Sequence, residues 1–236
     1  MPRVAIDCFH EHLPEVPAAT AVVAIDVIRA TTTAISGAAS GHGIYPAGSM
    51  EGAVRLAADL DRPLLAGELG GVQPYGFDLQ NSPTEIVALP ESGRPIILLS
   101  TSGTRLVTEA SASNETYLAC LRNATAQARH LAASGRDALI LGADSRGEFR
   151  EEDQLCAARI GAALVRAGYE VADGVTEAVI DRWAYARDDA FIDGRSARYL
   201  RETEQHQDLA FVLEHVDDLD QVFGLESGCV RAVGGA

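Results

Sequence analysis

A short apolar segment, residues 21–25, ends on Asp26, which is followed by Arg29 and by threonines at positions 31–33. Carboxylate oxygens are good ligands for Mg²⁺, and a carboxylate can also act as a nucleophile. The planar guanidinium group can hold two phosphate oxygens at once, and backbone N–H groups at a helix start attract anions. These residues therefore fit a phosphate and metal site. They also fit a strand end followed by a threonine N-cap, so this motif alone leaves both interpretations open.

Polar residues follow other apolar segments in the same way. Glu68 fits a surface acid, a metal ligand or a general base, and Asn81 and Ser82 could simply close a turn. The sequence STSGT at 100–104 fits a turn or a cradle of hydroxyl and N–H groups for an oxyanion. The acids of EFREED at 148–153 fit a helix N-terminus, which favours negative charge, or a contribution to the site.

Four apolar segments predict strands buried on both faces, at 21–26, 62–67, 94–100 and 137–143. We expect helices in the segments that follow them, at 34–40, 68–83, 105–112 and 151–168. Strands that alternate with helices predict an α/β domain with a largely parallel sheet. Ligands bind outside the carboxyl ends of such strands, so the polar loops should converge there.

The last third of the chain is less informative. Residues 169–236 predict one or two amphipathic helices and then short strands, and we expect a strand near Leu209–Leu213. We interpret residues 1–236 as a single domain, with a subdivision near residue 169 as the alternative.

The charge balance restricts the partners. The formal net charge is −15, and such a surface repels phosphate backbones and anionic lipids, so we expect neither a nucleic acid nor a membrane partner. All 19 basic residues are arginine, which excludes a Schiff-base lysine, a pyridoxal-phosphate anchor and a P-loop lysine. The four cysteines form no C-x-x-C motif, and no apolar run approaches the roughly 18 residues that span a bilayer. We therefore expect a cytoplasmic protein.

Several motifs occur together in one order. They are AIDVIRATTT at 24–33, GELGG at 67–71, FDLQNSP at 77–83, LLSTSGT at 98–104, CLRNAT at 120–125 and LGADSRGEFREED at 141–153. This combination resembles the 2-phosphosulfolactate phosphatase family, also called the ComB family. The resemblance covers nearly the whole chain and is strongest from Val22 to Gly161.

The resemblance implies a three-layer α/β/α fold with a largely parallel or mixed central sheet. It implies an Mg²⁺-dependent phosphatase for a small phosphorylated 2-hydroxy acid, 2-phosphosulfolactate, which would yield sulfolactate and phosphate. The oligomeric state stays open, a homodimer included.

The resemblance also assigns roles to residues of the motifs. The catalytic residues would be Asp26, Arg29, Glu68 and Asp153. The metal ligands would be Asp26, Glu68 and Glu152, although Asp26 could instead attack phosphorus. The substrate-binding residues would be Thr31, Thr32, Asn81, Ser82, Thr101, Ser102, Gly103, Thr104 and Asn123, with Gly67 beside Glu68.

Two positions depart from the family pattern. Leu69 stands where the family usually has arginine, and Ser102 stands where it usually has asparagine. One cation and one amide are therefore missing where an anionic substrate would lie, and we expect Arg105 or Arg122 to join Arg29 in balancing its charge. A phosphatase for a related carboxylate and a non-catalytic binder of a small phosphorylated acid stay as alternatives.

Overall fold

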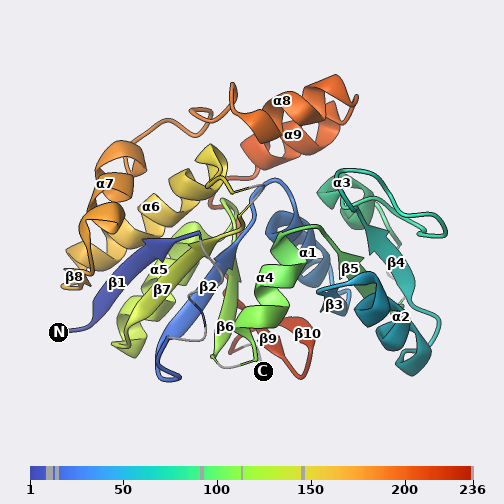
Figure 1. Ribbon diagram of the computed structural model, residues 1–236, viewed down its shortest axis with the longest axis horizontal. Coiled ribbons are helices and arrows are strands. Elements are labelled where there is room, and N and C mark those ends of the chain that lie inside the picture. Colours follow the sequence, from blue (N-terminus) through green and yellow to red (C-terminus); the bar gives the residue numbers. More distant parts are fainter. Residues whose placement is uncertain (9–12, 14–15, 91–92, 113, 145–146, 235–236) are drawn as a thin grey trace.

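The computed structural model describes residues 1–236 except 9–12, 14–15, 91–92, 113, 145–146 and 235–236. The described strands form one sheet, in the order β4-β5-β3-β10-β9-β6-β2-β7-β1-β8. In chain order they are β1 (Arg3–Asp7), β2 (Ala21–Ile25), β3 (Ile44–Ala47), β4 (Leu64–Gly67), β5 (Ile96–Leu99), β6 (Thr116–Ala119), β7 (Ala138–Gly142), β8 (Glu170–Val171), β9 (Phe223–Glu226) and β10 (Cys229–Ala232). Helices flank the sheet (Figure 1), which confirms the predicted α/β class with a mostly parallel, mixed sheet.

The sheet consists of two parallel groups of strands that a C-terminal hairpin joins. In one group β2 pairs in parallel with β6 and β7, and in the other β3 pairs in parallel with β5. Strands β9 and β10 pair antiparallel with each other and with the neighbouring strands β6 and β3. All five residues of β2 are buried, as expected for a strand covered on both faces.

The helices cover opposite faces of the sheet because strand residues alternate between the faces. Ile44 and Ile96 belong to the core cluster that contains residues of α1, whereas Ala47 and Ile97 belong to the cluster that contains residues of α2. None of the described helices has the length and apolar character to cross a membrane. In chain order they are α1 (Ala30–Ala39), α2 (Met50–Asp59), α3 (Pro83–Val87), α4 (Gly103–Ala110), α5 (Ala124–Ser134), α6 (Glu151–Arg166), α7 (Gly174–Trp183), α8 (Arg195–Glu202) and α9 (His206–Glu214).

The four predicted strands are confirmed as β2, β4, β5 and β7, and three of the predicted helices are confirmed as α1, α4 and α6. The helix predicted at 68–83 is wrong, because the chain runs as a loop from β4 to the short helix α3. Gly70, Gly71 and Gly76 in this loop have φ angles of 63°, 88° and 85°. A right-handed helix requires negative φ, so these glycines exclude it.

The strand predicted near Leu209–Leu213 is also wrong, because these residues lie in α9. Asp208, Leu209 and Val212 are buried, and this spacing places them on one face of a helix rather than on one face of a strand. Three helices, α7 to α9, precede the C-terminal strands, where one or two were expected. The short strands predicted after them are confirmed as β9 and β10.

Helices α8 and α9 lie at the end of the sheet toward which the parallel strands run, next to α3 (Figure 1). The loops that follow β2, β4, β5 and β7 lie at this same end. The last third of the chain therefore first crosses the carboxyl ends of the strands and then returns to the middle of the sheet as β9 and β10.

The C-terminal hairpin should contribute strongly to stability through Phe223, whose side chain is fully buried. We expect Phe223→Ala to lower the free energy of unfolding by about 3–5 kcal/mol, because it loses apolar burial and leaves a cavity. Denaturant unfolding measures this, with Val54→Ala as the control, since Val54 is 63% exposed on α2. If both variants lose less than about 1 kcal/mol, the hairpin does not pack as described.

Candidate active site

A cavity of about 470 Å³ lies at the carboxyl ends of the strands. Its lining includes seven of the residues singled out in the sequence, namely Asp26, Arg29, Glu68, Asn81, Thr101, Ser102 and Asp153. These residues come from the loops after β2, β4 and β5 and from the first turn of α6. The predicted convergence of polar loops at one edge of the sheet is therefore found in the structure.

The threonines after Asp26 shape the turn between β2 and α1. The backbone N–H of Asp26 donates to Thr31 Oγ1 at 2.9 Å, and Thr32 Oγ1 donates to the carbonyl of Val27 at 2.8 Å. The helix begins at Ala30 with Arg29 as N-cap and no side-chain cap, so no threonine caps it. Thr31 and Thr32 do not line the cavity, because their hydroxyls bond to the main chain.

Of the other expected substrate-binding residues, some bond to the main chain outside the cavity and some line the cavity. Ser82 Oγ caps α3, Thr104 Oγ1 accepts from the N–H of Ser100, and Asn123 Oδ1 accepts from the N–H of Cys120. These three side chains are buried and fix loop conformations beside the cavity rather than line it. Thr101, Ser102 and Asn81 face the cavity in the same loops.

Gly103 packs directly against the carboxylate of Asp26. A Cβ atom at this position would lie 2.2 Å from Asp26 Oδ2 and 2.7 Å from Ala30 Cβ. Only glycine lets the start of α4 approach the turn after β2 so closely. Gly103 therefore sets the position of the Asp26 carboxylate without offering a side chain to a ligand.

Glu68 clamps two loops together at the cavity wall. Its Oε1 accepts from the N–H of Thr101 at 2.7 Å, and its Oε2 accepts from the N–H of Gly71 at 2.6 Å and from Thr101 Oγ1 at 2.9 Å. Three donors already use both oxygens of this carboxylate. Glu68 thus holds the loop after β4 against the loop after β5, and its negative charge helps to raise the pKa of Asp26.

Three buried acidic side chains lie near one another, two of them, Asp26 and Asp153, in the cavity lining and the third, Glu152, behind it. Burial, followed by the negative charge of Glu68, raises the pKa of Asp26 to about 7. Burial, followed by the charges of Glu152 and Asp26, raises the pKa of Asp153 well above its usual value. Asp153 Oδ1 accepts from the N–H of Val27 at 2.7 Å, which ties α6 to the turn after β2. The pKa of Glu152 is raised by burial as well, although Glu152 itself does not line the cavity.

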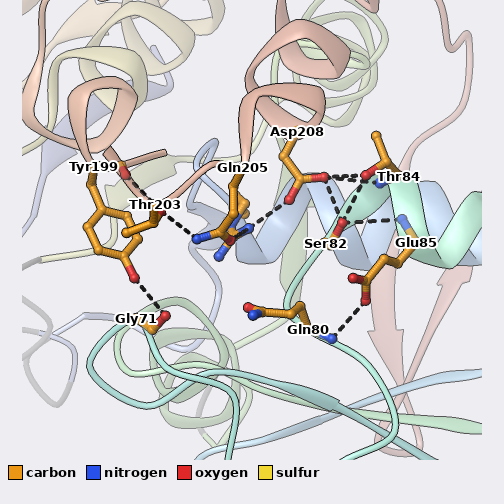
Figure 2. Close-up of polar contacts among 10 residues, drawn as sticks. Gly71, Gln80, Ser82, Thr84, Glu85, Tyr199, Thr203, Gln205 and Asp208 are labelled. Carbon is orange, nitrogen blue, oxygen red and sulfur yellow. Dashed lines mark hydrogen bonds and ion pairs between the residues drawn. The ribbon is translucent and has the colours of Figure 1, made fainter. Parts of the chain in front are cut away.

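Arg29 is held by two residues of the C-terminal third that the sequence did not single out. Its Nη1 donates to Asp208 Oδ2 at 2.6 Å and to Gln205 Oε1. Asp208 Oδ1 in turn accepts from Ser82 Oγ at 2.7 Å and from Thr84 Oγ1 at 2.5 Å (Figure 2). The Arg29 side chain is 4% exposed and that of Asp208 is 1% exposed, so this ion pair is buried.

The other cations of the cavity are not those expected from the sequence. Arg105 pairs with Glu109 at 2.7 Å and Arg122 pairs with Asp218 at 2.7 Å, and neither lines the cavity, so that prediction is wrong. The cavity instead contains three arginines that the sequence did not single out, namely Arg150, Arg195 and Arg198.

Periodicity could have found two of these arginines. The lining residues of α8 are spaced i, i+3, i+4 and i+7, which places them on one helical face. They are Arg195, Arg198, Tyr199 and Glu202, with Ser196 and Leu200 beside them. Tyr199 Oη donates to the carbonyl of Gly71 at 2.7 Å, which fixes α8 to the loop after β4 (Figure 2).

An α/β protein whose parallel strands end in loops that hold carboxylates and arginines around one cavity belongs to the class of α/β proteins that bind small anionic ligands. The family model described as 2-phosphosulpholactate phosphatase matches residues 8–227. The chain belongs to this family.

Curated relatives match over much of the chain. A protein of Caldanaerobacter subterraneus subsp. tengcongensis is 34% identical over 218 residues, which is 89% of each chain. A protein of Deinococcus radiodurans is 34% identical over 188 residues, which is 76% of this chain and 75% of the relative. One of Symbiobacterium thermophilum is 40% identical over 141 residues, covering 58% and 60% of the two chains. Each is named "Probable 2-phosphosulfolactate phosphatase".

The contact between Gly103 and Asp26 leads to a stability prediction. We expect Gly103→Ala to destabilise the protein by about 1–3 kcal/mol, because the added methyl group overpacks the turn after β2. Gly52→Ala is the matched control, since a Cβ there meets only Ser49 Oγ at 3.5 Å. This control should be neutral or stabilising, because alanine favours a helix over glycine. Equal unfolding midpoints for the two variants would contradict the close packing at Gly103.

Proposed function

We propose that the protein is an Mg²⁺-dependent phosphatase that hydrolyses the phosphate monoester of a small 2-hydroxy acid, 2-phosphosulfolactate. The family membership supports this substrate. The observation that carries the proposal is the meeting of buried carboxylates with a buried arginine in one cavity, at Asp26, Asp153 and Arg29. Such a pairing suits a phosphate ester and the cation that accompanies it.

The donor set fits Mg²⁺. Asp26 and Asp153 line the cavity as buried carboxylates, and Asn81 Oδ1 is a buried acceptor with no hydrogen-bond partner among the described residues. In the part of the chain that the structure describes, no three acidic, histidine or cysteine side chains are grouped to hold one ion. This suits an ion that keeps several waters and binds through one or two carboxylates and substrate phosphate oxygens, as Mg²⁺ does.

We propose Asp26 and Asp153 as the residues that would hold the ion. Glu68 and Glu152 are not proposed as ligands of the ion. The oxygens of Glu68 already accept three hydrogen bonds, and Glu152 lies behind the cavity wall. When bound, Mg²⁺ would neutralise phosphate charge and stabilise the leaving alkoxide.

The side chains of the protein would bind and orient the phosphate. Both hydrogen bonds that Arg29 donates to described residues, Asp208 and Gln205, start at Nη1, so Nε and Nη2 would serve as donors to two phosphate oxygens. The hydroxyl of Ser102 at the wall would add a donor on the side of the loop after β5, whereas the hydroxyl of Thr101 already donates to Glu68. This arrangement would fix the phosphorus in line with its attacking group, which accounts for a large part of the barrier reduction in phosphoryl transfer.

Asp26 and the metal can be tested together. We expect hydrolysis of 2-phosphosulfolactate to stop in EDTA and to return with Mg²⁺ or Mn²⁺. Asp26→Asn keeps the shape of the side chain and removes its charge, so kcat should fall at least ~10²-fold. Asp59→Asn is the control, because Asp59 is exposed at the end of α2.

Two results would contradict this proposal. One is activity that survives EDTA, and the other is near-normal turnover in a folded Asp26→Asn variant. If the wild-type protein binds the ester with Mg²⁺ but hydrolyses none of it, the alternative of a non-catalytic binder is correct.

Arg29 should not be replaceable by lysine. A lysine ammonium cannot bridge Asp208, Gln205 and two phosphate oxygens, because it lacks the planar fork. We expect Arg29→Lys to raise KM and to lower kcat, each by about tenfold or more, in steady-state assays. Arg187→Lys is the control, since Arg187 is exposed and pairs with Asp189 outside the cavity. Unchanged kinetics of a folded Arg29→Lys protein would exclude a phosphate-binding role.

A further inference from the structure

We propose that Arg198 on α8 determines substrate specificity by binding a second anionic group of the substrate, a carboxylate or sulfonate remote from the transferred phosphate. This inference rests on the proposed function and names the residue that selects the substrate class. Arg198 lies in the C-terminal third, outside the loops that hold the buried carboxylates.

Arg198 projects from a helix whose position is fixed. Ala197 and Leu200 of α8 are fully buried, and Tyr199 Oη, at the cavity, donates to the carbonyl of Gly71 at 2.7 Å (Figure 2). On the cavity face, Arg195 and Arg198 follow each other at i and i+3. The guanidinium of Arg198 is thus carried to the cavity by a packed element rather than by a free loop.

Arg198 differs from the other cavity arginines in its partners. Arg29 is paired with Asp208, and both Arg150 and Arg195 donate to Glu148. Arg198 has no ion pair with any described residue, and its Nη2 donates at 3.1 Å to the backbone carbonyl of Asp193. A guanidinium has five N–H donors, so most of those of Arg198 remain for an anion in the cavity.

The strand-end loops and α6 contribute more carboxylates than arginines to the cavity, whereas α8 contributes more arginines than carboxylates. The lining has four carboxylates and four arginines, so it is formally neutral in a protein whose net charge is −15. Three carboxylates and two arginines come from the strand-end loops and the start of α6, namely Asp26, Glu68, Asp153, Arg29 and Arg150. Helix α8 contributes two arginines and one carboxylate, namely Arg195, Arg198 and Glu202.

A ligand with a single phosphate would be satisfied by Arg29 and a cation near Asp26. Arg198, the arginine of α8 that forms no ion pair with a described residue, therefore suits a ligand that carries a further anionic group. Carboxylates and sulfonates both present two oxygens to the paired N–H donors of a guanidinium, so Arg198 could bind either group in the same way.

Three substrates separate the possible ligands of Arg198. 2-Phosphosulfolactate carries both a carboxylate and a sulfonate, phospholactate carries the carboxylate alone, and glycerol phosphate carries neither. We expect Arg198→Ala to lower kcat/KM for 2-phosphosulfolactate about 10- to 100-fold, because a charged hydrogen-bonded pair is lost. The kcat/KM for glycerol phosphate should change less than about threefold. Arg198→Lys should recover part of the loss.

Phospholactate identifies the group that Arg198 binds. A loss on both acidic esters assigns the carboxylate, and a loss on 2-phosphosulfolactate alone assigns the sulfonate; both outcomes support the proposal. Arg55→Ala is the control for net charge, because Arg55 is exposed on α2 outside the cavity. An equal loss on all three esters, or no loss on any, would overturn it.

Binding without turnover keeps this inference separate from the proposed function. Calorimetry with sulfolactate and with inorganic phosphate, each with Mg²⁺, needs no catalysis. We expect Arg198→Ala to weaken sulfolactate binding about tenfold or more and to leave phosphate binding within about twofold. A wild-type protein that hydrolyses no ester but shows this difference would refute the phosphatase function and retain the role of Arg198. Equal binding of sulfolactate by the wild type and the variant would refute that role.

Discussion

Negative charge buried next to negative charge is the constraint on which this site depends. Asp26 and Asp153 lie in one cavity, and burial raises the pKa of both. Removing carboxylates from water is costly unless positive charge or hydrogen-bond donors compensate. The fold supplies the N–H of Val27 and the guanidinium of Arg29, in a protein whose net charge works against gathering anions. The remaining negative charge must be balanced by what the cavity binds. A site for a metal ion and a phosphate needs this uncompensated negative charge, because it attracts the cation.

The position of Arg29 is fixed by contacts among three segments that are remote in sequence: the turn after β2, the start of α3, and α9. Its partner Asp208 on α9 also accepts hydrogen bonds from Ser82 and Thr84 at the start of α3. A buried ion pair adds little net stability, because desolvation offsets the attraction. The pair instead fixes the orientation of the Arg29 guanidinium. Its Nη1 is held by Asp208 and Gln205, so its other donors face the cavity. The motif residue Ser82 thus acts on the site through Asp208.

The strand-end loops could be predicted from the sequence because the signal there is local. Apolar segments of four to five residues followed by Asp26, Glu68 or Thr101 predict strands and polar loops, and the rule for parallel sheets then brings the loops together. The Arg29–Asp208 pair and the central place of β9 and β10 could not be predicted, because both depend on contacts across more than a hundred residues. The segment around Leu209 favours a strand by residue type and becomes a helix because one of its faces is buried against the rest of the fold.

The C-terminal third therefore belongs to the site as much as to the scaffold. Helices α8 and α9 have eight and nine residues, and helices this short are marginal without tertiary contacts. Their contacts are the bond from Tyr199 to Gly71, the network of Asp208 and the return of the chain into the sheet as β9 and β10. Each of these contacts joins α8 or α9 to a loop of the cavity or to the sheet that positions it. A change that loosens the hairpin would accordingly reach Arg195 and Arg198 as well, because the C-terminal third both completes the sheet and carries these two arginines of the cavity.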